Sequence, residues 1–193
     1  MKTFALFTLA AAAVVSASAA TYTIDTSHSS AGFKVRHLMI SNVKGEFTKT
    51  TGTVTFDPKN LAASSVDATI DVSTISTREE RRDAHLKSPD FFDVAKFPTM
   101  TFKSTKFEAA GAGKYKVTGN LTLHGVTKPV VLELSNVTPE TKGMQGETRI
   151  GGQATTKINR KDFGLTWSKT MDGGGAVVGD EVDITLDLEL VKK

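Results

Sequence analysis

Apolar and polar residues alternate along most of the chain that follows residue 20. In the clearest run, Val66, Ala68, Ile70 and Val72 are separated by polar residues, and the run from Val182 to Leu190 repeats the pattern. Further runs lie at Val54–Phe56, Met100–Phe102, Tyr115–Leu123, Val130–Leu134 and Ile150–Ile158. Successive strand residues point to opposite faces, so this period predicts antiparallel strands with one apolar and one solvated face.

Turn sequences separate the predicted strands, at Asp57–Asn60, Gly111–Gly113 and Gly173–Gly175. Residues 77–86 break the alternation and have a helical composition. Thr77 and Glu80 have the spacing of a capping box, and Ser88-Pro89 ends the predicted helix. Gly119, inside one predicted strand, indicates a bend or bulge. The sequence therefore predicts about eight strands and one short helix.

An all-β chain whose apolar faces share one interior is expected to form an antiparallel barrel, because closure removes exposed strand edges. A barrel of about eight strands can hold one small ligand. A β-sandwich would show the same alternation, so the period alone does not separate the two architectures. The chain shows no internal repeat or linker, and residues 21–193 are expected to form one domain.

Residues 1–20 have the three parts of a secretory signal peptide: Lys2, an apolar run from Phe4 to Val15, and the small residues Ala17-Ser18-Ala19. Cleavage is expected after Ala19 or Ala20. The apolar run is too short to cross a bilayer comfortably, although an uncleaved anchor is the alternative. The later sequence contains no predicted membrane span, and export of the mature chain is expected.

Composition excludes several classes of chemistry. The chain has no cysteine, which excludes disulfides, thiol catalysis and cysteine-ligated metals. A net charge of +3 gives little support for nucleic-acid binding. His28, His37, His85 and His124 show no metal-ligand spacing, and no G-x-S-x-G motif accompanies Ser27-His28-Ser29. We therefore expect no enzyme, no metal site and no cofactor, with the histidines bonded to backbone or carboxylates.

Two further groups of residues have both a structural and a functional interpretation. The basic residues of the helical segment, Arg78, Arg81, Arg82 and Lys87, suit solvated ion pairs, or an arginine that grips an anionic headgroup. The aromatic residues that follow, Phe91, Phe92 and Phe97, suit a core plug at one barrel end, or the rim of an apolar cavity.

Several motifs in this order resemble the YceI-like family of periplasmic, polyisoprenoid-binding, lipocalin-like proteins, over about Tyr22 to Val191. The motifs are Ile24-Asp25, His28-Ser29, Phe33–Leu38, Val43–Phe47, Gly52, Phe56–Pro58, Arg82–Asp93, Phe97-Pro98, Thr101-Phe102, Gly119–Pro129, Arg160–Leu165 and Val182–Ile184. Each motif alone is weak, whereas the ordered combination is specific.

The resemblance implies an eight-stranded antiparallel lipocalin-like barrel with one short helix, an elongated hydrophobic cavity, and frequently a homodimer. It implies a periplasmic carrier without catalysis, whose ligand is a polyisoprenoid, an isoprenoid quinone or a fatty amphiphile. An alternative is a quinone carrier that serves a membrane redox partner, and a histidine-based enzyme is a third hypothesis.

Two sets of residues are expected to contact the ligand. The tail cavity is predicted to be lined by Phe33, Val35, Ile70, Phe102, Leu121 and Leu123, with Leu86, Phe92, Phe97 and Phe163 as further contacts. Headgroup contacts are predicted for His28, Arg36, His37, Arg82, Asp83, His85 and Arg160. For Asp83 and Arg160, bracing the helix against the barrel is an equal alternative.

Overall fold

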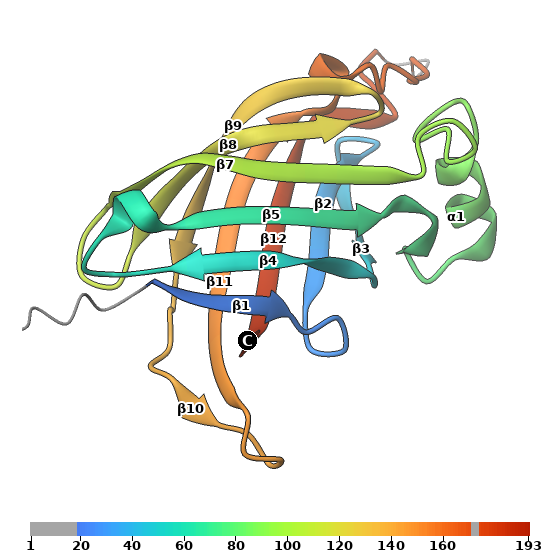
Figure 1. Ribbon diagram of the computed structural model, residues 1–193. Helices are drawn as coiled ribbons and strands as arrows, with labels where there is room; N and C mark the ends of the chain where they lie inside the picture. The colour runs from blue at the N-terminus through green and yellow to red at the C-terminus, as the bar shows by residue number, and fades with distance from the viewer. Residues whose placement is uncertain (1–18, 171–173) are drawn as a thin grey trace, which may run out of the picture.

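The computed structural model describes residues 19–170 and 174–193, which form a closed antiparallel β-barrel of eight strands with one α-helix (Figure 1). The predicted leader, residues 1–20, lies outside the described residues except for its last two. The barrel strands are β1 (Ala20–Ile24), β4 (Thr50–Phe56), β5 (Ser65–Asp71), β7 (Thr99–Ala109), β8 (Tyr115–Leu123), β9 (Val126–Ser135), β11 (Thr148–Asn159) and β12 (Val178–Lys192).

The strand order around the barrel is β11-β9-β8-β7-β5-β4-β1-β12, and β12 pairs again with β11 to close the ring. This pairing confirms the predicted barrel and excludes the sandwich. Along β12, the end near Leu190 pairs with β1, while Val178 to Asp187 pair with β2 (Ser30–His37). Strands β3 (Ser41–Phe47) and β6 (Ile75–Ser76) extend the sheet beyond β2.

The alternating apolar residues face the barrel interior, as the sequence predicts. Val54 of β4, Val117 and Leu123 of β8, and Leu132 of β9 are all buried, as is Ile150 of β11. Their polar neighbours lie on the outer face, where Lys34 and Asp183 form one of several ion pairs, 3.0 Å apart. The strands are therefore held by a one-sided core that lines the inside of the ring.

The helix α1 (Glu80–Lys87) is present, but the predicted capping box is wrong. The N-cap is Glu79, whose carboxylate accepts hydrogen bonds from the backbone N–H groups of Arg81 and Arg82 at 3.1 and 2.6 Å. Thr77 cannot cap the helix because the chain turns at Arg78, which has φ of 61°. The C-cap is Ser88, as the Ser-Pro pair indicates.

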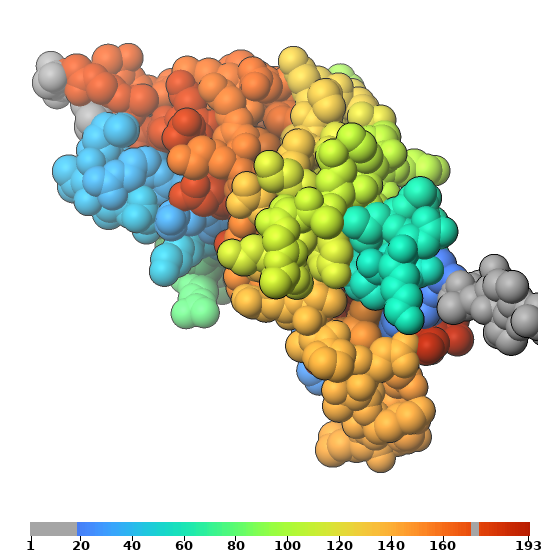
Figure 2. Space-filling view, turned by 90° about the vertical axis from the view of Figure 1, so that its left-hand side faces the viewer, coloured from blue at the N-terminus to red at the C-terminus, as the bar shows by residue number. Residues whose placement is uncertain are grey.

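Two segments lie outside the barrel wall (Figure 1). The helix α1 lies at one end of the barrel. The hairpin formed by β10 (Thr141–Lys142) and the start of β11 projects outward from the body of the molecule, as Figure 2 also shows. The segment before this hairpin is anchored by Glu140, which accepts a hydrogen bond from the Tyr22 hydroxyl at 2.8 Å and pairs with Lys192 at 2.7 Å. Burial and the adjacent Glu140 carboxylate raise the pKa of Tyr22 to about 12.

Within the described residues, no helix has both the length and the apolar character needed to span a bilayer.

Candidate functional site

The barrel contains an apolar cavity made of two adjoining chambers. One chamber lies toward the β10 hairpin and is lined by Val137, Ile150 and Leu190, among others. The second lies toward α1 and is covered by Leu86 of that helix and by Phe91 from the following loop. The chambers share the side chains of Ile70, Met100, Phe102, Leu121, Leu132 and Leu186. They therefore form one elongated space along the barrel.

The chemistry of this lining is almost entirely hydrocarbon. Among the described residues that line the two chambers, Arg160 is the one with an ionisable side chain, and the other polar side chains are threonines. Such a surface offers few groups that could polarise or deprotonate a substrate. It can bury a long apolar chain, for which each CH₂ removed from water contributes up to about 0.8 kcal/mol.

Two cavity phenylalanines lie against glycines on the neighbouring strand. A Cβ atom built on Gly45 would lie 2.4 Å from the ring of Phe33, and one built on Gly119 would lie 2.4 Å from the ring of Phe102. The pairing of β7 with β8 shifts register between Ser104, which lies opposite Gly119, and Lys106, so the irregularity lies in β7 and not in the strand of Gly119, where the sequence predicts a bend or bulge. Because these glycines have no side chain, each ring packs directly against the neighbouring strand.

All six residues predicted for the tail cavity line it: Phe33, Val35, Ile70, Phe102, Leu121 and Leu123. Leu86 and Phe92 line the second chamber as well, whereas Phe163 is buried in the adjoining core and Phe97 packs on His124, with ring centroids 4.6 Å apart. Met100, Leu132 and Leu186 also line the cavity and are not among the predicted ligand contacts, although each lies on a predicted alternating apolar face. Ligand contact by these residues remains a prediction.

The residues predicted to hold a headgroup do not converge on one place. His28 lies in the turn between β1 and β2, whereas Arg36 and His37 lie at the far end of β2. His85 of α1 is hydrogen-bonded to Asp90 at 2.8 Å and packs against Phe91. None of these four side chains lines either chamber.

Arg82 and Asp83 hold α1 to the rest of the structure. Both side chains bind Thr77, which is buried: the Arg82 guanidinium donates to its hydroxyl and carbonyl at 2.7 and 2.9 Å, and Asp83 accepts from its backbone N–H at 2.8 Å. These contacts give both side chains a bracing role.

Arg160 is 4% exposed and reaches the end of the second chamber, but protein acceptors surround it. Nε donates to the carbonyl of Gly179 at 2.9 Å, Nη1 to those of Leu165 and Trp167, and Nη2 to that of Val178 and to the carboxylate of Asp180. Burial lowers the pKa of the guanidinium, and the charge of Asp180 opposes that shift. Arg160 thus ties the segment before β12 to the barrel end.

Three aromatic rings pack together at this end of the barrel, and one of them, Phe91, lines the second chamber. His85, Phe91 and Trp167 contact one another with ring centroids 4.9 to 5.1 Å apart. They come from α1, from the loop after it and from the segment that follows Arg160. Phe91, which covers the second chamber, is therefore held by side-chain packing between three separate segments of the chain.

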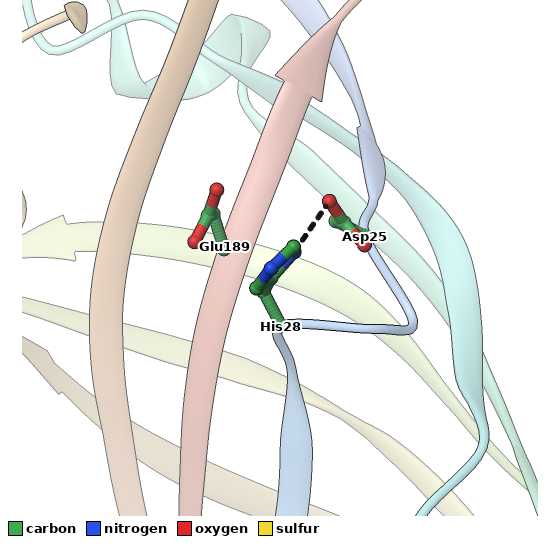
Figure 3. A group of neighbouring side chains, drawn as sticks. All are labelled: Asp25, His28 and Glu189. Carbon is green, nitrogen blue, oxygen red and sulfur yellow. Dashed lines mark hydrogen bonds and ion pairs between the residues drawn. The ribbon is translucent and has the colours of Figure 1, made fainter. Parts of the chain in front are cut away.

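One group of possible metal ligands occurs within the described residues, formed by Asp25, His28 and Glu189 (Figure 3). His28 Nδ1 lies 3.0 Å from Asp25, and Arg149 Nη1 donates to Asp25 at 2.6 Å and also to Glu189. Arg149, and secondarily His28, hold the pKa of Asp25 well below its usual range. The Arg149 guanidinium contacts both carboxylates, so the group is an ion-pair network that links β11 to the end of β1 and to β12.

A closed antiparallel barrel with an elongated apolar cavity defines a lipocalin-like binding barrel. Residues 22–190 match the model of the YceI-like domain. A UPF0312 protein of Vibrio parahaemolyticus is 41% identical over 189 residues, which cover 96% of this chain and 94% of the relative. A UPF0312 protein of Vibrio cholerae is 42% identical over 166 residues, which cover 83% of this chain and 87% of the relative. The chain belongs to the YceI-like family.

Solved structures share the fold. BcnA of Burkholderia cenocepacia superposes with a TM-score of 0.75 at 26% identity, covering 86% of this chain and 98% of BcnA. The YCEI protein of Campylobacter jejuni gives a TM-score of 0.68 at 35% identity, covering 81% and 89%. A polyisoprenoid binding domain of Saccharophagus degradans gives 0.64, covering 89% and 98%; at 16% identity it indicates the fold alone.

Proposed function

We propose that this protein is a non-catalytic carrier that holds a polyisoprenoid or a similar long-chain amphiphile in its barrel. The observation that carries the proposal is the elongated cavity, whose lining is hydrocarbon except for threonines and Arg160. Because each nitrogen of Arg160 already donates to a protein acceptor, the cavity suits a tail better than a charged group. Membership of a family with a polyisoprenoid-binding structural relative is consistent with this ligand class.

The proposed place of action is the periplasm. It is supported by the three-part leader in residues 1–20 and is compatible with the absence of cysteine. An isoprenoid quinone belongs to the same ligand class, because its tail is also an isoprenoid. We therefore include the delivery of a quinone to a membrane redox partner as a variant of the carrier function, and we expect a homodimer.

Native mass spectrometry of the mature protein, followed by organic extraction, tests the proposal. We expect a bound isoprenoid or other long-chain amphiphile; a quinone absorbance band in the extract would select the quinone variant. Leu121→Asp and Leu123→Asp place a carboxylate in the cavity wall and are expected to abolish binding. Asn120→Asp is the matched control, since Asn120 lies on the exposed face of the same strand.

The carrier function would be wrong if the folded protein stayed lipid-free after incubation with isoprenoid alcohols and quinones. It would also be wrong if the Leu121 and Leu123 variants bound lipid as well as the Asn120 variant. The same native spectra give the oligomeric state.

A further inference from the structure

Two large apolar side chains are exposed side by side at the turn between β2 and β3. Met39 is 51% exposed and Ile40 is 77% exposed. In the part of the chain that the structure describes, the other exposed large apolar residues are Val131 in β9 and Met144 between β10 and β11, neither of them in this turn. Single exposed apolar residues are ordinary, whereas an adjacent pair at a hairpin tip calls for an explanation.

The backbone of this turn is held in an uncommon conformation. Leu38 and Met39 have φ of 49° and 59°, in the left-handed region where hairpin turns usually carry glycine or asparagine. The Arg36 guanidinium donates to the carbonyl of Met39 at 2.9 Å, and the Leu38 N–H donates to the carbonyl of Val177 at 2.8 Å. Neighbouring groups thus fix the turn in the shape that presents Met39 and Ile40 to the outside.

Positive charge surrounds this apolar pair. From Lys34 to Lys44 the chain carries three basic residues and no acidic one. Lys34 is paired with Asp183, but Arg36 and Lys44 are exposed and form no ion pair with a described residue. An apolar tip flanked by unpaired cations complements a bilayer that contains anionic lipid, because the side chains can enter the interface while the cations contact headgroups.

The turn also lies next to the cavity. Val35 lines the second chamber and precedes Met39 by four residues on the same hairpin, and Val178, which pairs with His37, lines that chamber too. Figure 2 shows this hairpin, in light blue, at the edge of the molecule beside the orange-red segment that leads into β12. A lipid that leaves a bilayer at the turn would therefore meet the chamber covered by α1.

We propose that the β2–β3 turn docks the protein on an anionic bilayer, with Met39 and Ile40 inserted at the interface and Arg36 and Lys44 against the headgroups. This proposal rests on the carrier function proposed above, for which it supplies the route between membrane and cavity.

Co-sedimentation with vesicles tests the docking. Mature protein is mixed with vesicles of phosphatidylethanolamine and phosphatidylglycerol, or with vesicles of phosphatidylcholine alone. We expect binding to the anionic vesicles that weakens with added salt. Met39→Ser combined with Ile40→Ser should reduce this binding by about tenfold or more, since several buried CH₂ groups are lost. Lys44→Gln should weaken it to a smaller extent and flatten the salt dependence.

Met144→Ser is the matched control, because Met144 is fully exposed in the β10–β11 turn, away from the proposed docking surface. Equal binding by the double variant and this control would overturn the proposal. So would a double variant that changes only the oligomeric state, which would make the turn an interface between copies of the chain.

Extraction of the cavity separates the two proposals. Docking is overturned, and the carrier function stands, if wild-type protein contains lipid but ignores anionic vesicles. The carrier function fails, and docking stands, if the protein binds vesicles through Met39 and Ile40 yet never holds lipid in the barrel.

Discussion

At the scale of single residues, the cavity depends on two positions in its wall where glycine provides no side chain. Phe33 and Phe102 occupy the space that a side chain at Gly45 or Gly119 would need. This arrangement widens the interior without weakening the strands at these positions, because the aromatic ring replaces the packing that glycine lacks. The size of the cavity is thus set by small residues as much as by large ones.

Gly119→Ala is expected to lower the free energy of unfolding by roughly 1–3 kcal/mol and to weaken lipid binding. The new Cβ would lie 2.4 Å from the Phe102 ring and 2.7 Å from the backbone oxygen of Lys103, so the ring must move into the cavity. Urea unfolding and lipid titration measure both effects. Gly32→Ala is the control, with its Cβ in ordinary contact 3.4 Å from Thr185 O. Equal effects of both substitutions would contradict this account.

Thr50→Val is expected to stabilise the protein by about 1 kcal/mol. Thr50 is 4% exposed, and its hydroxyl has no hydrogen-bond partner among the described residues, so a methyl group of the same shape removes a desolvation cost. Thermal and urea unfolding test this. Thr26→Val should do the opposite, because the Thr26 hydroxyl donates to the Thr50 carbonyl at 2.8 Å. A Thr50 variant less stable than wild type would refute the interpretation.

At the scale of elements, the cover of the second chamber depends on one buried arginine. Arg160 connects the carbonyls of Leu165 and Trp167 to that of Gly179, at the start of β12. The segment carrying Trp167 is also held by the rings of His85 and Phe91 and by the Val177 N–H, which donates to the Lys169 carbonyl. Among these attachments, the guanidinium is the one that joins the segment to the start of β12. Trp167 is the one tryptophan of the chain and reports directly on this segment.

Arg160→Lys is expected to shift Trp167 emission to the red and to cost about 1–3 kcal/mol of stability, because an ammonium cannot reach both groups of carbonyls. Fluorescence spectra and urea unfolding are the measurements. Lys161→Met, which removes an exposed pair with Asp180, should leave the emission unchanged. Unchanged emission in the Arg160 variant would show that other contacts order the segment.

The sequence predicts the elements that have a simple period and misses those that depend on distant partners. The alternating runs identify β4, β5, β7, β8, β9, β11 and β12, and through them the cavity lining. Strand β3 shows little alternation because Gly45 takes the place of an inward side chain. The headgroup residues could not be placed, because Arg82 and Arg160 donate to backbone carbonyls of nearby turns, and a pattern of side chains does not show where those carbonyls point.

At the scale of the whole molecule, the Arg149 network joins the first barrel strand to the last two. Arg149 of β11 binds Asp25, which follows β1, together with Glu147 and Glu189. Its position at the junction of these strands makes barrel closure sensitive to acid. Arg149 holds the pKa of both Asp25 and Glu147 below their usual ranges.

Acid should therefore destabilise the wild-type barrel in a defined direction. The folded carboxyl of Asp25 stays ionised at a pH where the unfolded one, with a pKa of about 3.9, takes up a proton. The contribution of the ionised Asp25 carboxylate to the free energy of unfolding is present above about pH 4, and it is lost as the pH falls toward the pKa of Asp25 in the folded protein. In Arg149→Met, urea midpoints should be lower at pH 7 and fall less steeply below pH 4.

Lys103→Met is the control for this experiment, because its pair with Asp67 is much more exposed and should contribute little. Parallel curves for wild type and the Arg149 variant would show that the network does not couple closure to pH.

The place of β12 at the closing seam also has a consequence for biosynthesis. Tyr22 pairs with Lys192 and Ile24 with Leu190, so the ring cannot form until β12 has been made. Contacts between such distant parts of a chain slow folding, because a very large loop must close before they form. A chain that still lacks β12 therefore stays open, with the apolar faces of its finished strands not yet enclosed.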